Sequence, residues 1–425
     1  MRKLLLAGVA LGAVAAYGPV SPARADDAVF PVTTDTSLAE LNGPSLNGAA
    51  PGSVQVNLGG RLFSSIWFMN NPSGTPSWAQ AEIPQLGNWL FLFPGFDYAS
   101  PGGWHFGVQA ELRATNATQG NGGDPSQPWW HQAWGYVSSA SFGKFQFGAP
   151  PSALTSTAVG TPDDFGTGVF FGWFSSNPYI PWVMGDAEDN YTFQQKLLYT
   201  TPTFGGFKLA VSYEPSAVGL NYCDCLTQGA PPDSGILMSR QRVEIAGQYK
   251  GTFGPVGFSA SAGYVWADAA KNGDVDVGQD VSFGNFGMQF TYAGFEFEGG
   301  ATMGRYNLAI VDDGNPMGPL PNGASNTTAG SVGFGYASGP VKVGVVYYHV
   351  GYDQMDFQPV GTGVSHPGVL NGYGFGAAYT VGPGVVLYAD GWIAWAQGLP
   401  VNNGQPTPTK REQPTGIGIG TFFTW

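Results

Sequence analysis

Apolar and polar side chains alternate along most of this chain with a period of two residues. At 206–214 one side of an extended strand carries Phe207, Leu209, Val211 and Tyr213, and the other carries Lys208, Ser212 and Glu214. Similar segments of about ten residues recur from Val54 onward. Because successive side chains of a strand point to opposite faces, the pattern predicts an all-β protein.

Short and long junctions alternate between these segments. Short junctions, all containing glycine as tight strand connections require, occur at 99–104, 140–144, 202–206, 251–255, 292–295, 337–340 and 381–384. Longer polar junctions lie at 69–87, 116–128, 150–190, 215–239, 268–281, 304–327, 351–370 and 396–412. Together they connect about sixteen strands, with about 14 or 18 as the alternatives because boundaries read from sequence are imprecise.

The last segment, 416–425, presents large apolar side chains on one face. That face carries Ile417, Ile419, Thr421, Phe423 and Trp425, and the other is mostly glycine. In a soluble protein this apolar face would be exposed to water, whereas in a transmembrane barrel lipid covers it. We therefore expect apolar faces toward lipid and charged faces toward a lumen. Phe423 and Trp425 are then membrane-interface aromatics, and aromatics near other strand ends, such as Trp104, Trp266 and Trp392, are expected to complete the interface girdles.

Composition favours a β-barrel over a helical membrane protein. Glycine accounts for 66 of 425 residues, aromatics for 14% and charged residues for only 11%, against about 25% charged in soluble domains. Beyond the N-terminus no apolar run reaches the length of about 18 residues that a membrane helix needs. The predicted fold is a transmembrane antiparallel β-barrel of about 16 strands, which is too wide for side chains to fill and leaves an aqueous channel.

Three segments are predicted along the chain. Residues 1–25 form a signal peptide, with Arg2 and Lys3 before an apolar stretch and Ala23-Arg-Ala25 as the cleavage site. Residues 26–53, rich in Pro, Gly, Asn, Ser and Thr, form a leader segment, and 54–425 form the barrel. The expected location is the bacterial outer membrane.

Charge excludes one class of partner. Without residues 1–25 the chain has 13 basic and 29 acidic residues, a net charge of −16. Nucleic-acid binding needs a basic face, so we expect none; an acidic opening instead attracts cations.

Neither a cofactor nor a metal is expected. Asp274, Asp276 and Asp280 offer carboxylates to Ca²⁺ but lack the glycine and terminal glutamate of a helix-loop-helix site, which favours a solvated acidic loop. Cys223 and Cys225 form a C-x-C pair, interpreted as a local disulfide or two exposed thiols, with a metal site as the less favoured alternative.

The longest junction, 150–190, is expected to fold inward. A loop of about forty residues is uncommon unless it has a function. Its apolar side chains, Val169, Phe170, Phe171, Trp173, Phe174 and Trp182 among them, need a wall to pack on. Folding against the lumen wall satisfies this need and narrows the pore.

Several segments resemble the Gram-negative general porins. They are 196–213, 141–148 just before the long loop, Asp164-Phe-Gly166 within it, 372–379 with Leu387-Tyr388, and the closing Phe423 and Trp425. The resemblance covers about 54–425. It implies a sixteen-stranded homotrimer for passive diffusion of ions and small hydrophilic solutes. It also implies contact with outer-membrane lipid and lipopolysaccharide, and recognition of the C-terminal strand by the barrel-assembly machinery.

The resemblance further implies a pore constriction where loop carboxylates face basic wall residues. By position the acidic candidates are Asp163, Asp164, Asp186, Glu188 and Asp189. The inward basic candidates are Arg61, Arg113, Lys196, Lys208, Arg240, Arg242 and Lys250. Arg61 and Arg113 fit best, because the family uses the inner faces of its early strands for the basic cluster.

Other functions stay open at this point. A substrate-specific porin would line its path with aromatics, for which Phe63, Trp67 and Tyr348 are candidates. A closed structural barrel would carry no current. A membrane-embedded hydrolase needs a serine beside an oriented histidine. His349 lies in the outward register, and no serine lies on that face within a residue or two of it. We therefore expect no enzyme.

Overall fold

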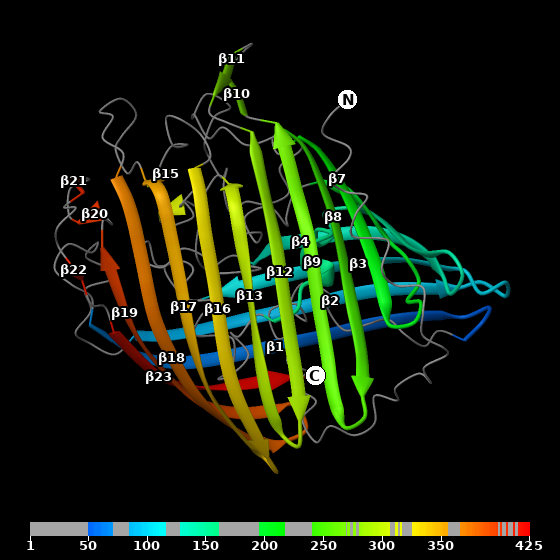
Figure 1. The fold of residues 1–425 in the computed structure, drawn as a ribbon. Coiled ribbons are helices and arrows are strands. Elements are labelled where there is room, and N and C mark those ends of the chain that lie inside the picture. The colour runs from blue at the N-terminus through cyan, green and yellow to red at the C-terminus, as the bar shows by residue number, and fades with distance from the viewer. Residues whose placement is uncertain are drawn as a thin grey trace.

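The computed structural model describes residues 50–70, 85–115, 128–160, 195–216, 240–268, 270–272, 275–277, 280–306, 311–312, 315–316, 325–355, 366–397, 400–401, 405–406, 411–412 and 415–425. Its main feature is one closed antiparallel barrel of sixteen strands (Figure 1). In order around the wall these are β1 (Val54–Asn70), β2 (Gln85–Ala99), β3 (His105–Thr115), β4 (Trp129–Ser139), β5 (Gly143–Gly148), β6 (Lys196–Thr200), β7 (Phe207–Ser216), β8 (Arg240–Phe253), β9 (Val256–Asp268), β12 (Val281–Tyr292), β13 (Phe295–Tyr306), β16 (Ser325–Ser338), β17 (Val341–Met355), β18 (His366–Gly382), β19 (Val385–Gln397) and β23 (Thr415–Thr424). The predicted all-β fold and strand count are confirmed.

Several short elements lie within the long junctions, at the rim of the barrel that we call the long-loop rim. Three two-stranded hairpins are formed by β10 (Ala270–Asn272) with β11 (Val275–Val277), β14 (Val311–Asp312) with β15 (Asn315–Pro316), and β20 (Pro400–Val401) with β21 (Gln405–Pro406). The two-residue β22 (Arg411–Glu412) pairs with the end of β19. A 3-10 turn, η2 (Thr155–Thr157), follows β5. Among the described residues, no helix is long and apolar enough to cross a bilayer.

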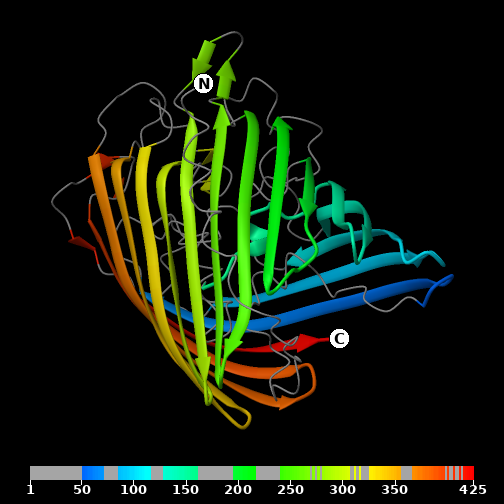
Figure 2. The same ribbon diagram turned by 45° about the vertical axis from the view of Figure 1, so that its right-hand side comes forward.

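The barrel closes between its first and last strands. β1 and β23 pair from Asn70 with Thr415 to Arg61 with Thr424. Gly60 and Trp425 then exchange two backbone hydrogen bonds, each 3.1 Å long. In Figures 1 and 2, β9, β12 and β13 run steeply across one wall while β1 and β2 cross behind them, as tilted barrel strands must. Every strand of the barrel thus has a neighbour on both sides.

The seven predicted short connections all lie on one rim. Each falls between the consecutive strand ends that the sequence indicated, from 100–104 to 383–384. In outer-membrane barrels the short-turn rim faces the periplasm. The chain's last residue, Trp425, lies at this rim, because β23 ends beside the first residues of β19.

The two faces of the wall are distributed as predicted. On β7, Leu209 and Val211 are exposed on the outward face, whereas Ser212 and Glu214 are buried on the lumen face. Aromatic rings of neighbouring strands meet on the outward face near the short-turn rim, with centroids 4.9 Å apart for Phe258 and Phe290.

One predicted interface aromatic lies on the opposite face. Trp392 is only 2% exposed and points to the lumen. It shares the register of Tyr388 and Asp390, both buried, whereas Leu387 on the other face is exposed. The prediction was wrong because nearness to a strand end does not determine the face, which the period of two does.

Candidate functional site

The start of the long junction lies inside the barrel. Residues 149–160 follow β5, and all of them except Ser156 are buried. The segment leaves the wall with a hydrogen bond from the Ala149 amide to the Ala133 carbonyl, 2.8 Å long. We call residues 149–160 the loop base.

Apolar packing holds the loop base against the wall. Leu154 is 4% exposed and belongs to a buried cluster with its neighbour Ala153 and with wall residues of β6, β7, β8, β9 and β12. These wall residues are Leu198, Ala210, Ala246, Val265, Ala267, Val281 and Phe283. Further along, the Val159 carbonyl approaches Gly287 of β12 so closely that a β-carbon there would lie 1.7 Å from the oxygen. Glycine at 287 therefore makes room for the loop backbone.

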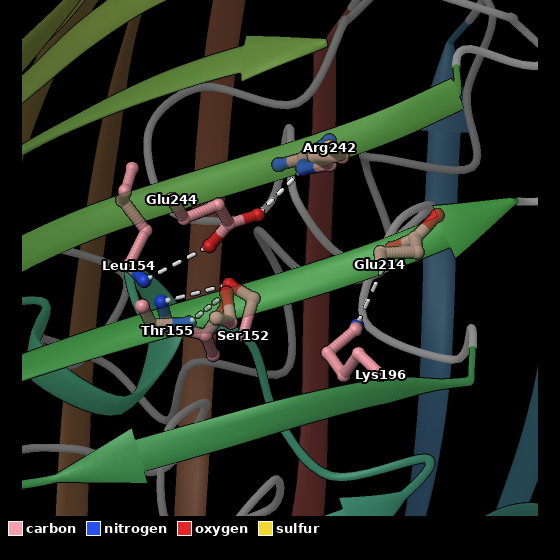
Figure 3. A network of polar contacts seen from close by, with 9 residues as sticks. Ser152, Leu154, Thr155, Lys196, Glu214, Arg242 and Glu244 are labelled. Atoms are coloured by element: carbon pink, nitrogen blue, oxygen red, sulfur yellow. Dashed lines mark hydrogen bonds and ion pairs between the residues drawn. The ribbon is translucent and has the colours of Figure 1, made fainter.

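Three wall side chains accept hydrogen bonds from the loop base. The Ala153 amide donates to Ser212 Oγ over 3.1 Å. The Leu154 amide donates to Glu244 Oε2 over 3.1 Å (Figure 3). The Val159 amide donates to Ser261 Oγ over 3.0 Å.

Two other wall side chains donate to loop carbonyls. Lys208 Nζ lies 2.9 Å from the Ser156 carbonyl oxygen. Gln248 Nε2 lies 3.0 Å from the Thr157 carbonyl oxygen. Gln248 Nε2 also makes a longer contact of 3.4 Å with the Ala158 carbonyl oxygen. The five shorter hydrogen bonds tie the loop base to strands β7, β8 and β9 and satisfy backbone groups that burial would otherwise leave unpaired.

Buried ion pairs lie beside this contact. Arg242 Nε donates to Glu244 Oε1 over 2.5 Å, and Lys196 Nζ lies 3.8 Å from Glu214 Oε2. All four side chains are at most 3% exposed. Figure 3 shows Arg242 and Glu244 on one strand, and Glu214 and Lys196 on neighbouring ones. Removing one partner of such a pair would leave an uncompensated charge in a poorly solvated place.

Three of the predicted basic wall residues therefore lie around the loop base. Lys196 and Arg242 pair with wall carboxylates, and Lys208 binds the loop backbone. Lys250, on β8, is exposed near the short-turn rim. Arg240 begins β8, but its side chain lies outside the described residues.

Arg61 and Arg113 lie in one row of the lumen wall, on either side of β2. Phe91 of β2 pairs with Arg61 on one side and with Arg113 on the other. The Arg113 guanidinium carbon lies 4.8 Å from the Phe91 ring centre, and that of Arg61 lies 5.6 Å from the Phe422 ring centre. Arg113 also donates to Glu111. Guanidinium groups stacked on rings in this way are held in a fixed orientation.

Other predicted site residues lie outside the part of the chain that the structure describes. These are Asp163, Asp164, Asp186, Glu188 and Asp189 of the long loop, with Cys223, Cys225, Asp274 and the side chain of Asp276. Asp280 is exposed just before β12. Among the described residues no three potential metal ligands gather.

The structure adds two polar groups on the lumen face that the sequence did not single out as sites. On β13, Glu296 lies 3.2 Å from Lys342 Nζ of β17, and Gln289 donates to both Glu296 and Glu298. Near the short-turn rim, Asp97 binds His105. The period of two placed these residues inward, but only the strand register shows which of them meet.

Comparisons with known proteins agree with this architecture. The sequence model of the Gram-negative porin family matches residues 10–391. Similar solved structures include the anion-selective porin from Comamonas acidovorans, with 17% identity and a TM-score of 0.57 over 88% of this chain and 100% of that one. In vitro folded OmpT of Vibrio cholerae, in its trimer form, gives 15% identity and a TM-score of 0.52 over 88% and 99%.

A mutant porin from Rh. blastica gives 14% identity and a TM-score of 0.51 over 87% of this chain and 100% of that one. A comparison with curated proteins gives no match. At these identities the structures show the common fold, whereas the family match covers most of the sequence. The chain belongs to the Gram-negative porin family and is an outer-membrane porin.

Proposed function

We propose that the barrel is a water-filled channel for passive diffusion of ions and small hydrophilic solutes, narrowed by the 150–190 loop. The observation that carries this proposal is the attachment of the loop base to the lumen wall. The first residues of the loop, Leu154 among them, are buried against the lumen wall, so the loop starts from within the lumen. This starting point supports the proposal that the loop narrows the channel.

Conductance in planar bilayers tests the proposal. Purified protein should give steady single-channel currents, and neutral sugars of rising size should reduce the current until they no longer enter. Exclusion that depends on size alone supports passive diffusion. Absence of current from folded protein would refute the channel.

A substrate-specific porin is the second candidate. Tyr348 of β17 and Tyr388 and Trp392 of β19 all face the lumen, but neighbouring side chains bury their rings, which would have to be uncovered before a sugar could stack on them. Saturable block of the ion current by one class of solute would favour this alternative over simple diffusion.

Ion selectivity is proposed to depend on charges across the constriction. Arg61 and Arg113 supply the basic side, and Asp163 and Asp164 are proposed for the acidic side. Reversal potentials under a salt gradient test the assignment in the double variant Asp163→Asn/Asp164→Asn. The variant should lose cation preference, and unchanged selectivity would exclude these two carboxylates.

We further propose a homotrimer. Ser64 of β1 donates to Asn88 of β2 on the outward face of the wall, and polar groups within the membrane are better covered by protein than by lipid. The Vibrio cholerae relative is described in a trimer form. Chemical cross-linking in detergent, with Ser64→Leu/Asn88→Leu as the variant, measures the oligomer, and a monomeric wild type would contradict the proposal.

The remaining partners and processing are also proposals. Lipid and lipopolysaccharide would cover the outward face, and the assembly machinery would recognise the strand that ends in Phe423 and Trp425, which are exposed on that face. Cleavage after Ala25 would release the leader and barrel, which N-terminal sequencing of the exported protein would verify.

No catalytic role is proposed. His349, the histidine considered for catalysis, faces outward, and its Nδ1 lies 2.8 Å from Asn371 Oδ1 rather than beside a serine.

A further inference from the structure

Four neighbouring strands bring titratable side chains together on the lumen face near the short-turn rim. Asp97 of β2 is fully buried. Tyr136 OH of β4 donates to its Oδ1 over 2.8 Å, and His105 Nδ1 of β3 lies 2.7 Å from its Oδ2. Lys144 Nζ of β5 lies 4.4 Å from the Tyr136 ring centre. We call these four residues the mouth cluster.

The backbone is shaped for this cluster. Gly107 pairs with Asp97 on one side and with Tyr136 on the other. A β-carbon at Gly107 would lie 2.4 Å from the Tyr136 ring. The missing side chain therefore lets Tyr136 lie across β3 and reach the carboxylate on β2.

The geometry leaves one group free to exchange protons with channel water. Both Asp97 oxygens have donors, which fixes the Nδ1–H of His105 toward the carboxylate and leaves Nε2 to gain or lose a proton. The His105 side chain is 33% exposed, against 1% for that of Asp97. Imidazole is the side chain whose charge ordinarily changes between about pH 5 and 8.

We propose that His105 is a pH-dependent charge at the periplasmic mouth of the channel and that its protonation weakens cation preference. The proposal rests on the proposed channel function. The Asp97 carboxylate from β2 faces the imidazole. The Tyr136 hydroxyl from β4 binds the other oxygen of that carboxylate, and the Lys144 ammonium from β5 lies over the Tyr136 ring. With Asp97 and Lys144 both charged the mouth cluster is neutral, and a proton on Nε2 makes it cationic.

Reversal potentials in 0.1 M against 0.02 M KCl at pH 7.5 and pH 5.5 test this inference. A unit charge about 10 Å from a permeating ion in water changes its local concentration about two-fold. Because the charge depletes K⁺ and enriches Cl⁻ by the same factor, we expect the ratio of K⁺ to Cl⁻ permeability of the wild type to fall by up to about four-fold at pH 5.5. The fall should shrink in 1 M salt, where the Debye length is about 3 Å.

Variants separate His105 from other titrating groups. His105→Gln should keep the pH 7.5 selectivity at both pH values, and His105→Lys should keep the pH 5.5 selectivity at both. His349→Gln is the matched control, because His349 faces outward and should behave as the wild type. The two His105 variants are expected to fix the ion selectivity at opposite limits of the pH response. If one of them misfolds, the other still tests the proposal.

The outcomes distinguish the two proposals. Equal pH dependence in the wild type and in His105→Gln would overturn the role of His105 and leave the channel intact. Absence of current in every variant, with the heat-resistant folded band still present on gels, would overturn the channel itself.

Discussion

Leu154→Ala is the sharpest test of the loop base as the element that holds the constriction. Leu154 is almost fully buried among side chains of five strands. Replacing such a leucine by alanine costs about 2–5 kcal/mol. The five hydrogen bonds to the loop backbone contribute about 1 kcal/mol each, so the substitution removes a large part of the total attachment. A factor of ten corresponds to about 1.4 kcal/mol. The population of channels with a detached loop base should therefore increase by a factor of between about 30 and a few thousand.

Single-channel recording measures this effect. Leu154→Ala should show more open-channel noise than the wild type and should admit larger sugars. Leu197→Ala is the matched control, because Leu197 lies on β6 next to Leu198 but is 46% exposed on the outward face. If Leu154→Ala keeps the noise and the sugar limit of the wild type, while its barrel loses thermal stability, the loop base does not hold the constriction.

Three further substitutions test other contacts. Gly287→Ala should displace the Val159 backbone and raise open-channel noise; quiet wild-type channels would show that the loop base adapts. Arg61→Gln should shift the reversal potential toward stronger cation preference by removing a lumen charge, and no shift would mean that ions do not sense this position. Gly60→Val should lower the yield of heat-resistant barrel on gels, because a β-carbon there would lie 2.2 Å from the Trp425 ring; an undiminished yield would show that the ring can move aside.

The barrel could be predicted from the sequence because its signals are local. Alternation with a period of two assigns each face, and glycine, in most cases with proline or serine, marks the seven short turns. Both signals span only a few residues, so they can be read from the sequence without knowing which strands pair. Trp392 shows the limit, because its position near a strand end suggests a membrane-interface residue, whereas its register with Tyr388 places it in the lumen.

The site was less predictable because it depends on register between distant segments. Arg242 and Glu244 are two residues apart, so the sequence places them on one face. Nothing local indicates that the Leu154 amide, 90 residues earlier, binds the same carboxylate. The mouth cluster has the same origin, because His105, Asp97 and Tyr136 meet only after β2, β3 and β4 align.

The seam between β1 and β23 has a consequence for folding kinetics. It joins segments about 350 residues apart in sequence, from Asn70 with Thr415 to Arg61 with Thr424, so it carries the greatest loop-closure entropy in the wall. Until it forms, the sheet presents two open edges that other chains can pair with. Barrel formation should therefore be limited by this last encounter, and conditions that slow it should divert protein into aggregates rather than into a stable half-barrel.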